Sequence, residues 1–134
     1  YGITAVREML RIGLNVASSK FWQFPYDDFE KRQHIILYGA GNVGRCYYNQ
    51  LKISGYFAEV IWTDSNAEML NSDICIYKIE EALKKKYDKI VIAVEKEYIA
   101  VEIKQQLLER CVPLEKLYWK EPNCVPDTFT FGVR

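Results

Sequence analysis

Residues 34–66 read HIILYGAGNVGRCYYNQLKISGYFAEVIWTDSN. The apolar run at 34–38 predicts a strand, and a helical pattern follows over about 43–54. A second strand is expected over 58–63, directly before Asp64. A strand, a glycine turn, a helix, a second strand and an acidic residue, in this order, are typical of a dinucleotide-binding βαβ unit.

Three glycines shape the turn between the first strand and its helix. Gly39 allows a tight turn, Gly41 lets the backbone approach a pyrophosphate, and Gly44 lets the helix pack closely on the strand. The free N–H groups and the dipole at the helix start favour an anionic diphosphate. Asp64, twenty residues after Gly44, is placed to accept hydrogen bonds from a ribose diol. Its charge opposes a 2′-phosphate, so NAD is expected in preference to NADP.

The later segments alternate between strand and helix patterns. In chain order we expect a strand at 74–77, a helix over 79–87, a strand at 89–94, a helix over 97–110 and a last strand at 117–119. Right-handed crossovers then give a five-stranded parallel sheet in the order 3-2-1-4-5, in a three-layer α/β fold that is Rossmann-like. The connection after Asp64 is short, so the third strand is expected at the sheet edge.

Two segments flank this domain, which is expected to span 34–120. Residues 1–33 are expected to form an N-terminal arm, with an extra helix over 3–17 and an aromatic-rich loop over 20–33 that docks on the core. The extra helix either packs on the sheet or serves as a linker or dimerising helix. Residues 121–134 lack periodicity and predict an irregular C-terminal tail.

Composition excludes several classes of function. The chain has 134 residues, with 49% apolar and 27% charged residues, as in an ordinary globular domain. Lys and Arg total 18, as do Asp and Glu, so the net charge is zero and nothing favours nucleic acid as a partner. No apolar run is long enough to predict membrane insertion. The four scattered cysteines and the single histidine lack zinc-ligand spacing, so we expect reduced thiols in a cytoplasmic protein.

The ligand site is expected beyond the carboxyl ends of the first, second and fourth strands. Phosphates would meet the N–H groups of 40–45, and the Arg45 guanidinium either adds a bond to phosphate or pairs with a nearby acid. Ser65 and Asn66 could reach the adenine edge, although turns favour the same residues. Ala93, Val94 and Glu95, at the end of the fourth strand, would wall the nucleoside, and Glu95 is either the polar residue of that wall or, as we rather expect, a plain surface acid. The predicted cofactor-binding residues are Gly39, Ala40, Gly41, Asn42, Val43, Gly44, Arg45, Asp64, Ser65, Ala93 and Val94.

Several residues resemble catalytic groups, but their positions in the expected fold do not suit catalysis. Tyr48 and Lys52 match the YxxxK pattern of short-chain dehydrogenases, but that family carries the pair on a much later helix. Cys46, in the first turn of a helix, is expected to be a buried packing residue. His34 opens the first strand, on the side away from the ligand edge. No nucleophile–base pair and no metal site can be named, so a binding module is the better interpretation.

The stretch 35–119 resembles a group of small Rossmann-like domains in bacterial enzymes of surface-polysaccharide assembly. The resemblance is carried by ILYGAGNVGR, IWTDSN, YDKIVIAV and IKQQLLERCVPLEKLYW. Such domains occur beside glycosyltransferase, methyltransferase or sugar-acyltransferase domains and in nucleotide-sugar-modifying proteins. The resemblance implies that the ligand is NAD, a nucleotide or a nucleotide sugar.

Three hypotheses follow. The first is an accessory nucleotide-binding module of a bacterial glycosyltransferase or another polysaccharide-biosynthesis protein, without complete catalysis of its own. The second is the cofactor half of an NAD-dependent sugar-nucleotide oxidoreductase or epimerase, and the third is a structural or oligomerisation domain with an empty site. Because the chain begins at Tyr1 rather than Met, we expect either an excised piece of a larger protein or a processed one, and in an excised piece the chemistry could reside in the missing part. A homodimer is the alternative partner.

Overall fold

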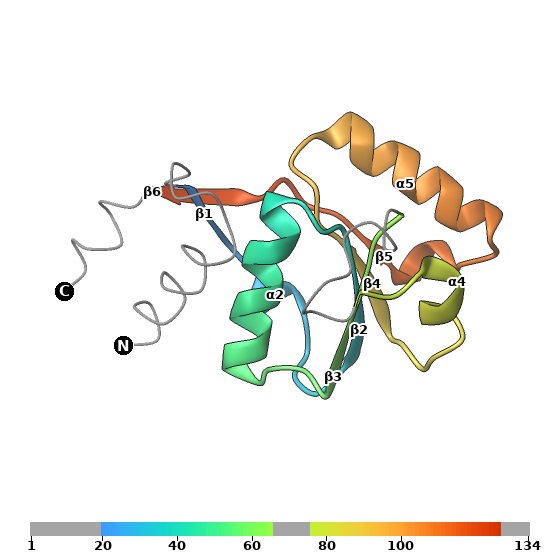
Figure 1. The fold of residues 1–134 in the computed structure, drawn as a ribbon, viewed down its shortest axis with the longest axis horizontal. Helices are drawn as coiled ribbons and strands as arrows, with labels where there is room; N and C mark the ends of the chain where they lie inside the picture. The colour runs from blue at the N-terminus through green and yellow to red at the C-terminus, as the bar shows by residue number, and fades with distance from the viewer. Residues whose placement is uncertain (1–19, 66–75, 127–134) are drawn as a thin grey trace.

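The computed structural model describes residues 20–65 and 76–126, which form an α/β fold (Figure 1). Within these ranges the elements are, in chain order, β1 (Lys20–Gln23), the 3-10 helix η1 (Tyr26–Asp28), β2 (His34–Tyr38), α2 (Asn42–Ser54), β3 (Glu59–Thr63), α4 (Ile79–Ala82), β4 (Lys89–Ile92), α5 (Glu97–Glu109), the 3-10 helix η2 (Leu114–Lys116), β5 (Leu117–Tyr118) and β6 (Asn123–Pro126). The extra helix expected over 3–17 lies outside the described residues.

A parallel sheet lies at the centre of the described part of the chain, with four strands in the order β3-β2-β4-β5. β2 is hydrogen-bonded on both sides, so that Ile36 is in register with Ile61 of β3 and with Ile90 of β4. These three isoleucines are buried, as expected for parallel strands covered on both faces. β3, β2, β4 and β5 are the second, first, fourth and fifth strands of the expected sheet, so their observed order agrees with the expected order 3-2-1-4-5 without its third strand.

The expected third strand is reduced, among the described residues, to one parallel bridge between Tyr77 and Thr63. The Tyr77 N–H donates to the carbonyl of Trp62 at 2.8 Å, and the Thr63 hydroxyl donates to the Tyr77 carbonyl at 2.6 Å. The bridge therefore lies at the outer edge of β3, where the third strand was expected. The chain turns into α4 two residues later, and residues 74 and 75 of the expected strand lie outside the described ranges.

α4 is shorter than the helix expected over 79–87, because it ends at Ala82. Ile79 and Ala82 are buried, whereas the three lysines at 84–86 are mostly exposed. Once the apolar positions stop, no packing supports a further helical turn, and short isolated helices are marginal in water. The lysine run therefore belongs to a turn that leads to β4.

Two layers cover the sheet, with α2 on one face and α4 and α5 on the other (Figure 1). Successive side chains of β2 alternate between these layers, as the pleat of a strand requires. Ile35 and Leu37 pack in the cluster beneath α2, and Ile36 and Tyr38 pack with α4 and α5.

The arm and the tail contain strands that the sequence did not predict. β1 pairs antiparallel with β6, with Trp22 opposite Cys124, so 20–33 is not wholly a loop and 121–134 is not wholly irregular. This ribbon joins segments about a hundred residues apart, and no local pattern announces such a pairing. Between β1 and β2 the arm also contains the single 3-10 turn η1.

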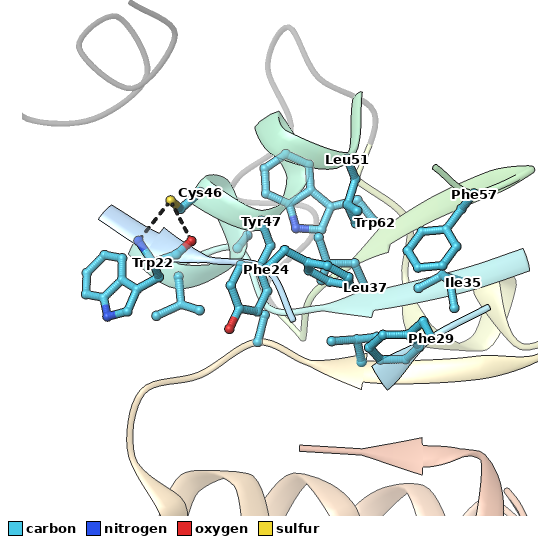
Figure 2. Close-up of a cluster of buried hydrophobic side chains, with 14 of the residues drawn as sticks. Trp22, Phe24, Phe29, Ile35, Leu37, Cys46, Tyr47, Leu51, Phe57 and Trp62 are labelled. Carbon is cyan, nitrogen blue, oxygen red and sulfur yellow. Dashed lines mark hydrogen bonds between the residues drawn. The ribbon is translucent and has the colours of Figure 1, made fainter. Parts of the chain in front are cut away.

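Aromatic side chains of the arm fill the face of the sheet beside α2 (Figure 2). The centroid of the Phe24 ring lies 5.1 Å from that of Tyr47 of α2 and 5.8 Å from that of Phe57, and both pairs make edge-to-face contacts. The ring centroids of Phe29 and Tyr118 of β5 lie 4.6 Å apart. Such pairs add stability beyond the area they bury. The arm thus covers the part of the sheet that α2 does not reach.

No helix within 20–65 or 76–126 is both long and apolar enough to cross a bilayer.

Candidate functional site

The turn after β2 begins at Gly39, where the chain passes between the ends of β3 and β4. Gly39 has φ +126°, a conformation that other residues rarely adopt. Its N–H donates to the Thr63 carbonyl at 2.8 Å, and a Cβ at this position would lie 2.7 Å from the Ala93 carbonyl oxygen. Both the backbone angle and the close neighbour therefore require glycine here.

Gly44 allows the first turn of α2 to rest on this turn. A Cβ on Gly44 would lie only 1.9 Å from the Gly39 carbonyl oxygen and 2.7 Å from its carbonyl carbon. This is the close packing of helix and strand that the sequence predicts for the third glycine of the motif.

Gly41 differs from the other two glycines because a Cβ there would meet no atom within 4 Å. It is the exposed N-cap residue of α2, and no side chain caps this helix end. Within the described ranges, we find no hydrogen bond donated by the backbone N–H groups of 41–44. The helix start therefore presents open space beside unpaired amides.

Arg45 lies next to these amides. Its backbone N–H donates to the Gly41 carbonyl at 2.9 Å, which begins the helical ladder. The side chain is half-buried, and its guanidinium forms no ion pair with a residue of 20–65 or 76–126. The alternative expectation, an ion pair with a nearby acid, is therefore not met within this part of the chain.

Asp64 reaches the glycine turn. One carboxylate oxygen accepts a hydrogen bond from the Ala40 N–H at 2.7 Å. The acid at the end of β3 and the loop at the end of β2 are therefore brought together, as the motif predicts. The structure differs from the prediction in one respect, because the Ala40 amide expected to meet phosphate is occupied by this carboxylate. Ser65 is exposed, and Asn66 lies outside the described residues.

The end of β4 forms the back of the site. Ala93 is 2% exposed, and its N–H donates to the Tyr38 carbonyl at 2.8 Å. Gly39 lies against this residue, so little of the Ala93 side chain is exposed. Val94 is half-buried and its carbonyl accepts a bond from the Trp119 indole N–H at 2.9 Å, whereas Glu95 is exposed.

Two aromatic residues at this edge were missed by the sequence analysis. Tyr38 is 6% exposed, and its burial, with a smaller effect from the charge of Asp64, raises the pKa of its hydroxyl. Trp62 is 2% exposed and its indole N–H donates to the Gly39 carbonyl at 2.6 Å. One signal was present in the sequence, because a tryptophan inside an apolar strand must find an acceptor for its N–H when it is buried.

The residues set aside as catalytic candidates have other contacts. The Tyr48 ring stacks on Trp62 with centroids 4.3 Å apart, and Lys52 is exposed on the same helix. His34 lies at the other end of β2, where its backbone N–H donates to the Asp88 carboxylate at 2.7 Å. Within the described residues no group of His, Cys, Asp and Glu could hold a metal ion.

Cys46 is a fully buried thiol that contacts the arm rather than a ligand. Its sulfur accepts a bond from the Trp22 N–H and donates one to the Trp22 carbonyl, both at 3.3 Å (Figure 2). Burial raises the pKa of the thiol to about 11, although the contacts with Trp22 and Gln50 lower it somewhat. The helix start therefore does not activate this cysteine.

We expect Cys46 to resist alkylation in the folded protein. At about pH 8 a thiol with a pKa of about 11 is thiolate only about one part in a thousand, so iodoacetamide should modify Cys46 at least about 100-fold more slowly than the exposed Cys111 and Cys124. The rate at Cys46 should rise as the pH approaches 11. Peptide mapping by mass spectrometry measures the three rates, and labelling in denaturant, where they should converge, is the control. Preferential labelling of Cys46 in the native state would contradict this assignment.

Comparisons with known proteins do not place the chain in a family, since no protein-family profile, curated protein or solved structure matches it.

Proposed function

We propose that this domain binds a nucleotide, with NAD as the preferred ligand, through a Rossmann-type arrangement of the glycine turn and Asp64. The observation that carries the proposal is the 2.7 Å bond between the Asp64 carboxylate and the Ala40 N–H, beside the open space at Gly41. The strand order β3-β2-β4-β5, with the bridge at Tyr77 in the third position, supports the same arrangement. Ligands of open parallel sheets bind where the strand order reverses, which here is between β2 and β4.

The diphosphate would lie at the start of α2. The N–H groups of 41–44 donate to no described residue, and the helix dipole adds a partial positive charge there. A glycine at position 41 leaves room for phosphate oxygens to approach the backbone. The Arg45 guanidinium, without a described ion-pair partner, would add a charge-assisted bond.

The ribose would lie beside Asp64. The Asp64 carboxylate, which lies beside the glycine turn, can exchange its bond with the Ala40 N–H for hydrogen bonds from both hydroxyls of an unmodified ribose. A 2′-phosphate at the same place would meet a like charge, which costs binding energy. NAD, ADP or a related nucleotide is therefore favoured over NADP.

We further propose that the domain is an accessory module of a bacterial polysaccharide-biosynthesis protein. The sequence resemblance supports this setting. The side chains considered as catalytic candidates make structural contacts instead, because Tyr48 stacks on Trp62 and the Cys46 thiol is hydrogen-bonded to Trp22 of the arm. The cofactor half of an NAD-dependent sugar-nucleotide enzyme would use the same binding site with catalytic groups from another domain.

A thermal-shift panel with NAD, NADP, ADP, UDP-sugars and S-adenosylmethionine tests the proposal. A ligand at 100 times its dissociation constant stabilises the fold by about 2.7 kcal/mol. We expect NAD or ADP to raise Tm by several degrees and NADP to act more weakly. If no member of the panel changes the Tm, the site is empty and the fold serves another purpose.

Gly41→Val should abolish this response and leave the fold intact. The Cβ at position 41 would meet no atom within 4 Å and φ is −82°, so the larger side chain is accommodated without strain. It would, however, occupy the space that a phosphate needs. Ala58→Val is a matched control, since Ala58 is exposed just before β3, at the amino-terminal ends of the strands and so away from the glycine turn. An unchanged ligand shift in Gly41→Val would place the site elsewhere.

A further inference from the structure

The peptide that joins Gly39 to Ala40 is held at both of its polar ends by side chains from the end of β3. Its carbonyl accepts a bond from the Trp62 indole N–H at 2.6 Å, and its N–H donates to the Asp64 carboxylate at 2.7 Å. Trp62 and Asp64 are two residues apart, and alternate residues of a strand project to the same side. The carboxyl end of β3 thus fixes the orientation of the Gly39–Ala40 peptide.

We infer that Trp62 is a positioning residue for nucleotide binding, which keeps the Gly39–Ala40 peptide in the orientation that lets the loop receive an anion. This inference rests on the proposed function. When Asp64 turns to the ribose hydroxyls, the Ala40 N–H becomes available to a phosphate oxygen. The bond from Trp62 then remains as the hydrogen bond that holds the peptide in this orientation.

The opposite orientation of this peptide would harm the site. A rotated peptide would turn the Gly39 carbonyl oxygen toward the phosphates and withdraw the Ala40 N–H from them. Glycine at position 39, with φ +126°, makes such a rotation cheap, because a residue without a Cβ adopts many backbone conformations. The loop therefore needs a partner for the Gly39 carbonyl, and a buried indole supplies it.

Trp62 is itself held in place. Its ring is 2% exposed and stacks on the Tyr48 ring at an interplanar angle of 15°. A rigid donor loses little conformational entropy when it makes its bond. The indole lies among the buried side chains beneath α2, as Figure 2 shows, so it bonds to the Gly39 carbonyl from the core.

The test removes the N–H of Trp62 and retains a ring at that position. Trp62→Phe does this by mutation, and incorporation of benzothienylalanine, which has sulfur in place of the N–H, does it with almost no change of shape. Trp22→Phe is the matched control, because the indole of Trp22 donates no hydrogen bond within the described residues although it is also buried. The readouts are the carbonyl chemical shift of Gly39, amide hydrogen exchange at 40–44, and the Kd for ADP.

We expect amide exchange at Ala40, whose N–H donates to Asp64, to accelerate at least about tenfold, while exchange in β4 stays close to that of the unsubstituted protein. The Gly39 carbonyl shift should move, and the Kd for ADP should rise about tenfold. Trp22→Phe should change none of these local values. A purely structural role for Trp62 would accelerate exchange in β4 as well.

Two results would overturn the inference. One is a Gly39 carbonyl shift and loop exchange that do not respond to the loss of the indole N–H in the isosteric variant. The other is an unchanged Kd for ADP once the peptide has been released. Failure of the unsubstituted protein to bind any nucleotide would reject the proposed function, and the shift and exchange data would then still decide whether Trp62 holds the peptide.

Discussion

Gly44→Ala is expected to destabilise the fold by about 3 kcal/mol or more, although it adds only one methyl group. The new Cβ would lie 1.9 Å from the Gly39 carbonyl oxygen, far inside van der Waals contact. The obstructing atoms belong to the backbone and cannot turn aside as a flexible side chain would. The Gly39 carbonyl is also held by Trp62, so relief requires α2 to move off the sheet or the turn to open. Urea unfolding measures the loss as a lower midpoint at unchanged slope.

Gly41→Ala is the control for this prediction. The same methyl group, added three residues earlier in the motif, would meet no atom within 4 Å, and the backbone at Gly41 has φ −82°. Its stability should stay within about 1 kcal/mol of the unsubstituted protein, because the lower freedom of the unfolded chain offsets part of the loss of a better N-cap residue. Equal stability of the two variants would show that α2 does not rest on the turn as described.

The sequence predicted those parts of the fold that neighbouring residues decide. β2 and β3 lie within one residue of their expected bounds, and α2 and α5 within one residue of theirs, because apolar periodicity and turn residues are local signals. The two close contacts of the glycine turn follow from the motif in the same way. A glycine whose missing Cβ makes room for the backbone leaves a recognisable spacing in the sequence.

The features that the sequence missed depend on residues far apart in the chain. Nothing within Lys20–Gln23 indicates that Asn123–Pro126 pairs with it, because the partner strand is what makes either segment extended. The bond from Trp62 to Gly39 joins residues 23 positions apart, so neither residue alone reveals it. The occupation of the Ala40 amide by Asp64 depends on a side-chain orientation, which spacing does not specify.

Gln50→Ala is expected to destabilise the fold by about 3 kcal/mol, because it removes the amide that binds the arm to α2. Gln50 is 6% exposed, and its side-chain oxygen accepts a bond from the Phe24 N–H at 3.0 Å. Its side-chain nitrogen donates to the Trp22 carbonyl at 2.6 Å, so it offers β1 the donor and acceptor that a neighbouring strand would offer. Alanine would leave the buried Phe24 N–H without a partner and a cavity beside the aromatic rings. Urea unfolding measures the effect.

Two further variants distinguish the loss of the Gln50 hydrogen bonds to the arm from a general loss of stability in α2. Asn49→Ala, at a half-buried neighbour on the same helix, should stay within about 0.5 kcal/mol of the unsubstituted protein, and a similar result for Gln50→Ala would show that the arm does not depend on the amide. Gln50→Glu keeps the acceptor for Phe24 but replaces the donor to Trp22 with a buried charge, which raises the pKa of the new carboxyl. Its stability should therefore be lowest above that pKa and recover as the pH falls through it, because protonation restores a donor and removes the charge. A loss for Gln50→Glu that did not vary between about pH 5 and pH 8, relative to the unsubstituted protein, would contradict a role for the donor.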